Sequence, residues 1–323
     1  MPPAHRPPPA DSVDDMDAGS WPSERQLLID TDIGTDVDDA LALATILGSG
    51  ATLHGCTTSY GDTVLRARIV KRLARLAGRE VLAVPGAREP LSDLPVWWAG
   101  HEGKLYPSLE AEPVDDGLDP GVFLSTPVLA QPGRVDVLCL APLANLAGVL
   151  EATPDFARKV RRLVIMGGRW WREADPEHNF ASDPEAAAVV FASGAQILVI
   201  GLDTTMQVTL DRVAVDRIAA AGPLGEMLAR EVRQWLAHWN DELNTPHDAV
   251  AATALLEPGL FTFTPLGTAR IATGGTRAGT SAFTADPAGT VRVATALDVA
   301  TVTARIIERI CRAGKVPGEQ FAR

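Results

Sequence analysis

Short apolar runs recur along the chain and alternate with segments whose apolar positions follow the spacing of a helix. Runs made mostly of valine, isoleucine and leucine are typical of strands that are buried on both faces. Such runs are found at Gln26–Asp30, Thr52–Thr58, Val81–Val84, Val135–Leu140, Arg162–Met166 and Ile197–Gly201. The segments with helical spacing are Asp38–Leu47, Leu65–Leu76, Leu143–Leu150, Pro184–Ala192 and Leu224–Asn240. This alternation predicts right-handed βαβ units, and therefore an α/β fold with a mostly parallel, Rossmann-like sheet flanked by helices.

The two ends of the chain differ from this regular part. Residues 1–25 hold six of the 24 prolines together with acidic and small residues, a composition that predicts a disordered tail. Near the other end, Thr268–Thr273 and Thr290–Thr295 are predicted strands, and Leu297–Arg312 is a predicted closing helix. Division of the length by roughly 150 residues per domain favours two domains. Because no linker interrupts residues 26–323, we expect one large domain there.

The composition limits the partners that the chain can have. With 29 lysine and arginine residues against 41 aspartate and glutamate residues, the formal net charge is −12. Nucleic acids and anionic membranes both attract clustered positive charge, so neither is an expected partner. The N-terminal segment lacks the apolar core of a signal peptide, and the longest apolar stretch, Val135–Leu150, is too short to span a bilayer. We expect a cytoplasmic, globular protein that acts on a small molecule.

The most distinctive segment follows the first predicted strand. Five carboxylates lie within ten residues, at Asp30, Asp32, Asp36, Asp38 and Asp39, where a strand ends and a helix begins. Helix capping explains one or two of them, whereas five like charges stay together only around a cation or shared protons. Oxygen ligands without cysteine or histidine favour Ca²⁺ or Mg²⁺ over zinc. An EF-hand loop does not fit, because its glycine and glutamate are absent from the required positions.

Four further motifs follow in the chain. They are Leu140-Ala141-Pro142-Leu143-Ala144-Asn145, Met166-Gly167-Gly168, Glu177-His178-Asn179-Phe180 with Asp183-Pro184-Glu185, and His247-Asp248-Ala249-Val250-Ala251. Together with the acidic loop, these motifs stand in one consistent order over residues 26–310. In this order they resemble the nucleoside hydrolases, the inosine–uridine-preferring family.

The resemblance implies the nucleoside hydrolase fold and Ca²⁺-dependent hydrolysis of the N-glycosidic bond of a ribonucleoside. It also implies a homodimer or a homotetramer. The implied Ca²⁺ ligands are Asp32, Asp39, Asp248 and the backbone carbonyl of Leu140. Since the acidic loop is two residues longer than the common family form, Asp36 can replace or assist Asp32.

The remaining implied residues surround the sugar and the leaving base. Asp38, Glu177 and Asn179 are expected to bind ribose hydroxyls, and His247 is the expected proton donor to the base. Cleavage of the N-glycosidic bond builds positive charge on the ribose ring. The attacking water then needs a carboxylate base, for which Asp32 is the candidate.

Tryptophans are candidates for the base pocket. Trp235 and Trp239 lie four positions apart on a predicted helix, so they share a face. They either stack on a nucleobase or pack in the core. The pairs Trp97-Trp98 and Trp170-Trp171 fall in predicted loops, where an exposed tryptophan favours binding.

Two loop residues complete the set of expected substrate contacts. Asp62 stands where the family usually has asparagine after the second strand, which puts an extra carboxylate near the sugar or the metal. His101 lies in a loop that resembles one near the family's active site.

Two alternative functions remain open at this stage. A dehalogenase-type Mg²⁺ phosphatase also begins with an apolar strand followed by two aspartates, with Asp30 as nucleophile and Asp32 as acid. A non-catalytic ribose-binding homologue would keep the fold, and the altered sugar contacts motivate this second alternative.

Overall fold

The computed structural model of the chain describes residues 25–171 and 175–315. Its strands are β1 (Gln26–Thr31), β2 (Leu53–Thr58), β3 (Ala83–Pro85), β4 (Val135–Cys139), β5 (Arg162–Met166), β6 (Ile197–Ile200), β7 (Phe261–Phe263), β8 (Gly267–Ile271), β9 (Ser281–Ala285) and β10 (Val291–Leu297). Within the described ranges they form one ten-stranded sheet in the order β3-β2-β1-β4-β5-β6-β10-β8-β9, and β7 pairs with β10 outside this order. The predicted tail, residues 1–25, lies outside the described residues apart from Arg25.

Most of this sheet is parallel, as predicted. β1 lies between β2 and β4 and pairs with both in parallel, and the parallel order continues through β5 and β6 to β10. The antiparallel pairs are confined to one side, where β7 and β8 pair with β10, and β9 pairs with β8. The apolar pattern does not predict β9, because its side chains at the edge of the sheet are all at least partly exposed.

The helices cover the sheet and include several that apolar spacing does not predict. They are α1 (Asp38–Leu47), α2 (Thr63–Leu76), α3 (Pro120–Ala130), α4 (Ala144–Ala152), α5 (Phe156–Lys159), α6 (His178–Ser182), α7 (Pro184–Ala192), α8 (Leu202–Thr205), α9 (Arg212–Ala219), α10 (Pro223–Trp239), α11 (His247–Leu256) and α12 (Val299–Gly314). The unpredicted helices α5, α6, α8 and α9 are short, and α3 contains an internal proline. Over the described ranges, no helix is long and apolar enough to cross a membrane.

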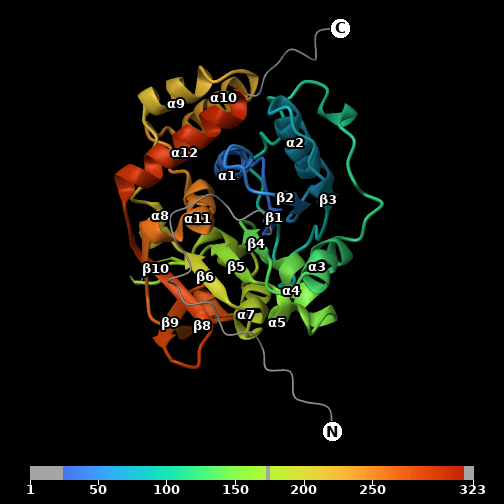
Figure 1. Ribbon diagram of the computed structural model, residues 1–323, viewed down its shortest axis with the longest axis vertical. Helices are drawn as coiled ribbons and strands as arrows, with labels where there is room; N and C mark the ends of the chain where they lie inside the picture. The colour runs from blue at the N-terminus through green and yellow to red at the C-terminus, as the bar shows by residue number, and fades with distance from the viewer. Residues whose placement is uncertain (1–24, 172–174, 316–323) are drawn as a thin grey trace.

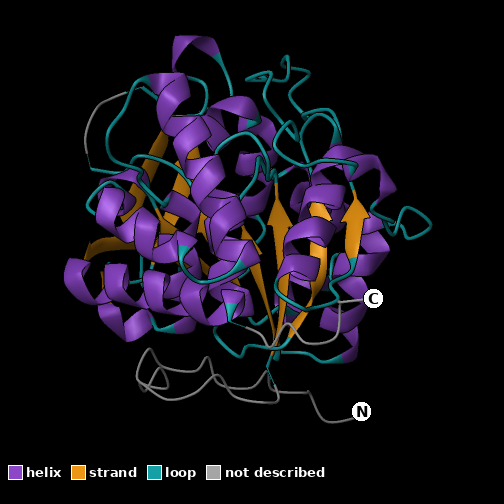
Figure 2. Ribbon diagram, turned by 90° about the horizontal axis from the view of Figure 1, so that it is seen from above, coloured by secondary structure: helices purple, strands orange, loops and turns teal. Residues whose placement is uncertain are grey.

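Successive residues of the central strands face two different hydrophobic clusters. In β1, Leu27 and Ile29 pack with helices α1, α2, α11 and α12, whereas Leu28 packs with α3, α4 and α7 on the other side. In β4, Leu138 packs in the same cluster as Leu27, and Val137 packs in the same cluster as Leu28. Helices lie on both sides of the strands in Figure 2, and α12 runs beside α9 and α10 in Figure 1. Burial of both faces explains why the central strands are near-continuous apolar runs.

The closing helix begins two residues later than predicted. Leu297 is the last residue of β10 rather than the first of a helix, and α12 begins at Val299. The side chain of Asp298 accepts a hydrogen bond from the backbone N–H of Thr301 at 3.1 Å. This cap satisfies a free donor of the first turn and sets the start of the helix.

The carboxyl ends of the central parallel strands meet at one edge of the sheet. Just beyond these ends lie Asp32 after β1, Tyr60 after β2, Leu140 after β4, Gly167 after β5 and Leu202 after β6. In open α/β sheets ligands bind outside this edge. The fold therefore brings together loops that are far apart in the sequence.

Candidate active site

The acidic loop connects β1 to α1 and is folded by its own side chains. The hydroxyl of Thr31 donates to the carboxylate of Asp39 and accepts the backbone N–H of Ile33 at 3.2 Å. The carboxylate of Asp36 accepts the backbone N–H of Val37 at 2.5 Å. These local bonds hold the loop against the first turn of α1.

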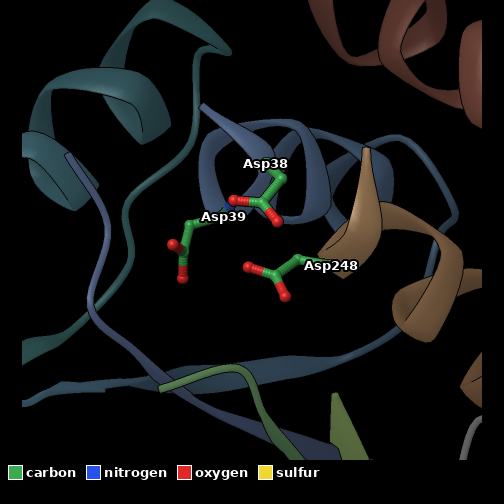
Figure 3. Close-up of side chains that lie close together, drawn as sticks. All are labelled: Asp38, Asp39 and Asp248. Atoms are coloured by element: carbon green, nitrogen blue, oxygen red, sulfur yellow. The ribbon is translucent and has the colours of Figure 1, made fainter. Parts of the chain in front are cut away.

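Three buried carboxylates converge where α1 and α11 begin. Asp38 and Asp39 lie in the first turn of α1, and Asp248 lies in the first turn of α11, which packs against α1. Each residue offers one oxygen, and these oxygens all lie within 4.8 Å of one another (Figure 3). The three side chains are 6%, 5% and 2% exposed. The geometry therefore gathers negative charge away from bulk water.

The electrostatics of this cluster favour a bound cation. Burial raises the pKa of Asp38, Asp39 and Asp248, and repulsion from neighbouring carboxylates raises each of these pKa values further. Burial also raises the pKa of Asp32, and it raises the pKa of Asp36 to about 8. A divalent cation would offset this repulsion. Because all the donors are oxygens, the residues present fit Ca²⁺ or Mg²⁺.

A cleft of about 680 Å³ opens beside the acidic cluster. Of the predicted site residues, those that line it are Asp32, Asp36, Asp38, Asp39, Leu140, Glu177, Asn179, Trp235, Trp239, His247 and Asp248. This volume lies within the range of small-molecule sites, which is about 300–1,000 Å³. The structure thus places nearly all of the predicted residues around one cavity.

Glu177 and Asn179 are held rigidly on one side of this cleft. The Glu177 carboxylate caps α6 and accepts the backbone N–H groups of Asn179 at 2.6 Å, Phe180 at 3.2 Å and Gly168 at 3.0 Å. The side-chain amide of Asn179 donates to the carbonyl of Leu140 at 2.7 Å. Burial raises the pKa of Glu177 on balance, although the hydrogen bonds from backbone N–H groups act in the opposite direction. Both side chains are therefore fixed before a ligand arrives.

His247 opens α11 immediately before Asp248. Its Nδ1 lies 2.7 Å from the hydroxyl oxygen of Thr205. Burial lowers the pKa of His247 to about 4, so the ring is neutral near pH 7. When the Thr205 hydroxyl donates to Nδ1, the ring carries its proton on Nε2. The neutral ring can then donate a hydrogen bond from Nε2 to a ligand, whereas a protonated ring would act as a charged acid.

Aromatic side chains form the outer part of the cleft. Trp97 and Trp239 stack with their ring centroids 6.5 Å apart, and Trp235 and Trp239 form a T-shaped pair with centroids 5.7 Å apart. His178 contacts Trp97 edge-on at 5.6 Å. Trp239 is 53% exposed, whereas Trp235 both lines the cleft and packs against the core. Flat, accessible rings of this kind can stack on a nucleobase.

Asp62 and His101 do not line the cleft. The carboxylate of Asp62 caps α2 by accepting the backbone N–H of Leu65 at 3.0 Å, which is why α2 begins at Thr63 rather than at the predicted Leu65. The ring Nε2 of His101 lies 2.8 Å from the carbonyl oxygen of Thr35. Both side chains therefore stabilise loops around the site in this structure.

A family model for the inosine-uridine preferring nucleoside hydrolases matches residues 27–304. This chain belongs to that family. It is 34% identical over 272 residues to "Probable uridine nucleosidase 2" of Oryza sativa subsp. japonica, which covers 79% of this chain and 80% of the relative. It is 31% identical over 249 residues to "Non-specific ribonucleoside hydrolase RihC" of Escherichia coli (strain K12), which covers 74% of this chain and 81% of the relative. The solved plant nucleoside hydrolase PpNRh1 superposes with a TM-score of 0.80 and 27% identity, over 89% of this chain and 99% of that one.

Membership confirms the resemblance seen in the motifs, and the chain is an enzyme of the nucleoside hydrolase class. The dehalogenase-type alternative is not favoured by the position of Asp30. That carboxylate is fully buried and accepts hydrogen bonds from the Thr57 hydroxyl and the Asn145 amide, both at 2.7 Å. Because Asp30 does not line the cleft, it is not placed to attack a phosphate ester.

Some residues of this nucleoside hydrolase site lie outside the motifs, as Tyr60 and Thr205 do, and others, Met166 and His178, lie within motifs but have no role assigned from the sequence. Tyr60, Met166 and His178 line the cleft with Trp97, and Thr205 lies behind His247. The position of Tyr60 just beyond β2 is a usable signal, because loops at that edge of a parallel sheet bind ligands. Thr205 has no such signal, because its role depends on a contact between α8 and α11.

Proposed function

We propose that this nucleoside hydrolase is Ca²⁺-dependent and releases the free base and ribose from a ribonucleoside. The proposed ligands of the ion are Asp32, Asp39, Asp248 and the Leu140 carbonyl, with Asp36 as a further ligand. One observation carries this proposal: buried carboxylates converge in a cleft that tryptophan side chains also line.

Asp38 belongs to the same group of close oxygens as Asp39 and Asp248. We therefore infer that Asp38 would bind ribose hydroxyls beside the position that Asp39 and Asp248 would give the ion. When bound, Ca²⁺ supplies the positive charge that offsets the carboxylates and orients the sugar and the water. A single arrangement of side chains then positions both reacting partners.

The remaining steps are assigned to side chains of the cleft. Asp32 takes a proton from the attacking water as the water oxygen bonds to C1′. The C1′–N bond breaks, and the ribose ring carries positive charge in the transition state. Glu177 and Asn179 hold ribose hydroxyls. His247 donates a hydrogen bond to the departing base, which leaves as an anion and then takes up a proton from water, while Asp32 releases to solvent the proton that it took.

The substitution Asp248→Asn tests this assignment against the control Glu151→Gln, an exposed carboxylate on α4. Removing one ligand charge is expected to lower kcat/KM for ribose release by at least roughly 10²-fold, while the control keeps wild-type activity. An assay of reducing-sugar release from a panel of purine and pyrimidine ribonucleosides measures this change in kcat/KM. Full activity in Asp248→Asn would contradict the metal assignment, and tight nucleoside binding without release by the wild type would favour the non-catalytic ribose-binding alternative.

We also propose a homodimer or a homotetramer, as the family resemblance implies. Light scattering during size-exclusion chromatography measures the mass of the assembly directly. A monomeric mass at micromolar concentration would contradict this proposal.

A further inference from the structure

The irregular chain that follows β3 forms one side of the cleft and carries Trp97. Side chains hold this segment in place. The backbone N–H of Trp97 donates to the Tyr60 hydroxyl at 2.8 Å. Nearer to β3, the N–H groups of Leu91 and Ser92 donate to the Asp183 carboxylate at 2.7 and 3.1 Å.

Glu102 connects the segment after Trp97 to the acidic loop. Its carboxylate accepts the backbone N–H groups of Ala99 and Gly100, both at 2.7 Å. It also accepts the hydroxyl of Thr35 at 3.2 Å. The Glu102 side chain is only 7% exposed, so water competes little for these bonds. One buried carboxylate therefore bonds both to the segment that follows Trp97 and to the acidic loop.

Thr35 is held on its other side as well. Its carbonyl is bound by the ring of His101 at 2.8 Å, and its hydroxyl accepts a hydrogen bond from the Arg66 guanidinium at 3.3 Å. Arg66 is fully buried and also donates to the carbonyls of Ile33 at 2.9 Å and Tyr60 at 2.7 Å. Hydrogen bonds therefore connect Glu102 through Thr35 to Arg66, which binds the backbone of the acidic loop at Ile33.

We propose that Glu102 is a positioning residue that, through Thr35, sets the spacing between the Trp97 side of the cleft and the acidic loop. This inference rests on the proposed function, in which the base contacts the aromatic side and the ribose contacts the carboxylates. Because one covalent bond joins base and ribose, both halves fit only when the two sides keep a fixed separation. Loss of the connection weakens the hold on the base in the ground state and the transition state alike.

Kinetics of Glu102→Gln and Thr35→Val test the connection, with Glu110→Gln as the control because Glu110 is an exposed carboxylate of the same segment. The glutamine keeps the size of the side chain but replaces an acceptor oxygen with an NH₂ group. We expect KM for the nucleoside to rise about tenfold in each test variant, and kcat to change by less than about threefold. Wild-type constants are expected for Glu110→Gln.

The double variant separates a shared connection from two independent effects. If Glu102 acts through Thr35, the rise in KM in the double variant is no larger than in the more affected single variant. Rises that multiply would overturn the proposal, as would a wild-type KM in either single variant or a loss confined to kcat.

Amide hydrogen exchange gives a second readout that needs no substrate. Exchange in residues 97–103 is expected to be at least about tenfold faster in Glu102→Gln than in the wild type or Glu110→Gln, while exchange in the core strands is unchanged. Equal exchange rates would overturn the proposal. If the wild type releases no ribose from any nucleoside, the proposed function fails, and this comparison alone decides the role of Glu102. If Glu102→Gln does not fold, Thr35→Val decides it by the same exchange measurement.

Discussion

In the proposed mechanism, the pair formed by His247 and Thr205 determines how the leaving base is stabilised. Burial lowers the pKa of the ring to about 4, and the Thr205 hydroxyl lies 2.7 Å from Nδ1. The structure places His247, a candidate from the motif His247-Asp248, in the cleft, whereas an unperturbed histidine titrates near neutral pH. Burial in the folded chain makes the ring neutral, and the contact with Thr205, 42 residues away, forms because α8 packs against α11.

His247→Ala is expected to lower kcat for ribonucleosides by about 10²-fold, because the departing base loses its hydrogen-bond donor. A p-nitrophenyl riboside, whose leaving group departs without a proton, is expected to lose less than about tenfold. Steady-state kinetics with both substrates measure the difference. His54→Ala is the control, because His54 is exposed on β2. An equal loss for both substrates would contradict the role given to His247.

Among the elements, the buried strands of the parallel sheet and most of the longer helices follow from the sequence pattern, with α3 as an exception. The predicted bounds match the structure in β5 at Arg162–Met166, α1 at Asp38–Leu47 and α7 at Pro184–Ala192. In these elements the spacing of apolar residues within the segment itself indicates the secondary structure. The edge strand β9 at Ser281–Ala285 does not follow, because an exposed edge needs no apolar run. Capping explains other differences, such as the start of α2.

The helix cap at Asp62 leads to a prediction that separates a structural role from a catalytic one. Asp62→Ala is expected to lower the free energy of unfolding by about 1 kcal/mol, because the N–H of Leu65 loses its acceptor. Nucleoside KM and kcat are expected to stay within about twofold of the wild type, since Asp62 does not line the cleft. Urea denaturation and steady-state kinetics measure the two effects. An increase in KM of tenfold or more would restore Asp62 as a substrate contact.

At the scale of the whole molecule, the parallel sheet creates the site by bringing distant loops to one edge. Asp39 and Asp248 are far apart in the chain, yet their oxygens lie within 4.8 Å because α1 packs against α11. The family resemblance implies this grouping, because it makes both residues ligands of one ion. The resemblance does not predict the bond between Thr35 and Glu102, which joins the acidic loop to a residue 67 positions further along the chain. Contacts of that kind depend on how the irregular segments pack.

The dependence of ribose release on Ca²⁺ tests the central claim most directly. Wild-type enzyme is assayed with a ribonucleoside panel as purified, after treatment with EGTA, and after return of Ca²⁺ or Mg²⁺. In the proposed mechanism the buried carboxylates hold a divalent cation that keeps them charged, so EGTA is expected to lower release by at least roughly 10²-fold, and Ca²⁺ is expected to restore it. Undiminished release in EGTA, or full restoration by Mg²⁺ alone, would contradict the account.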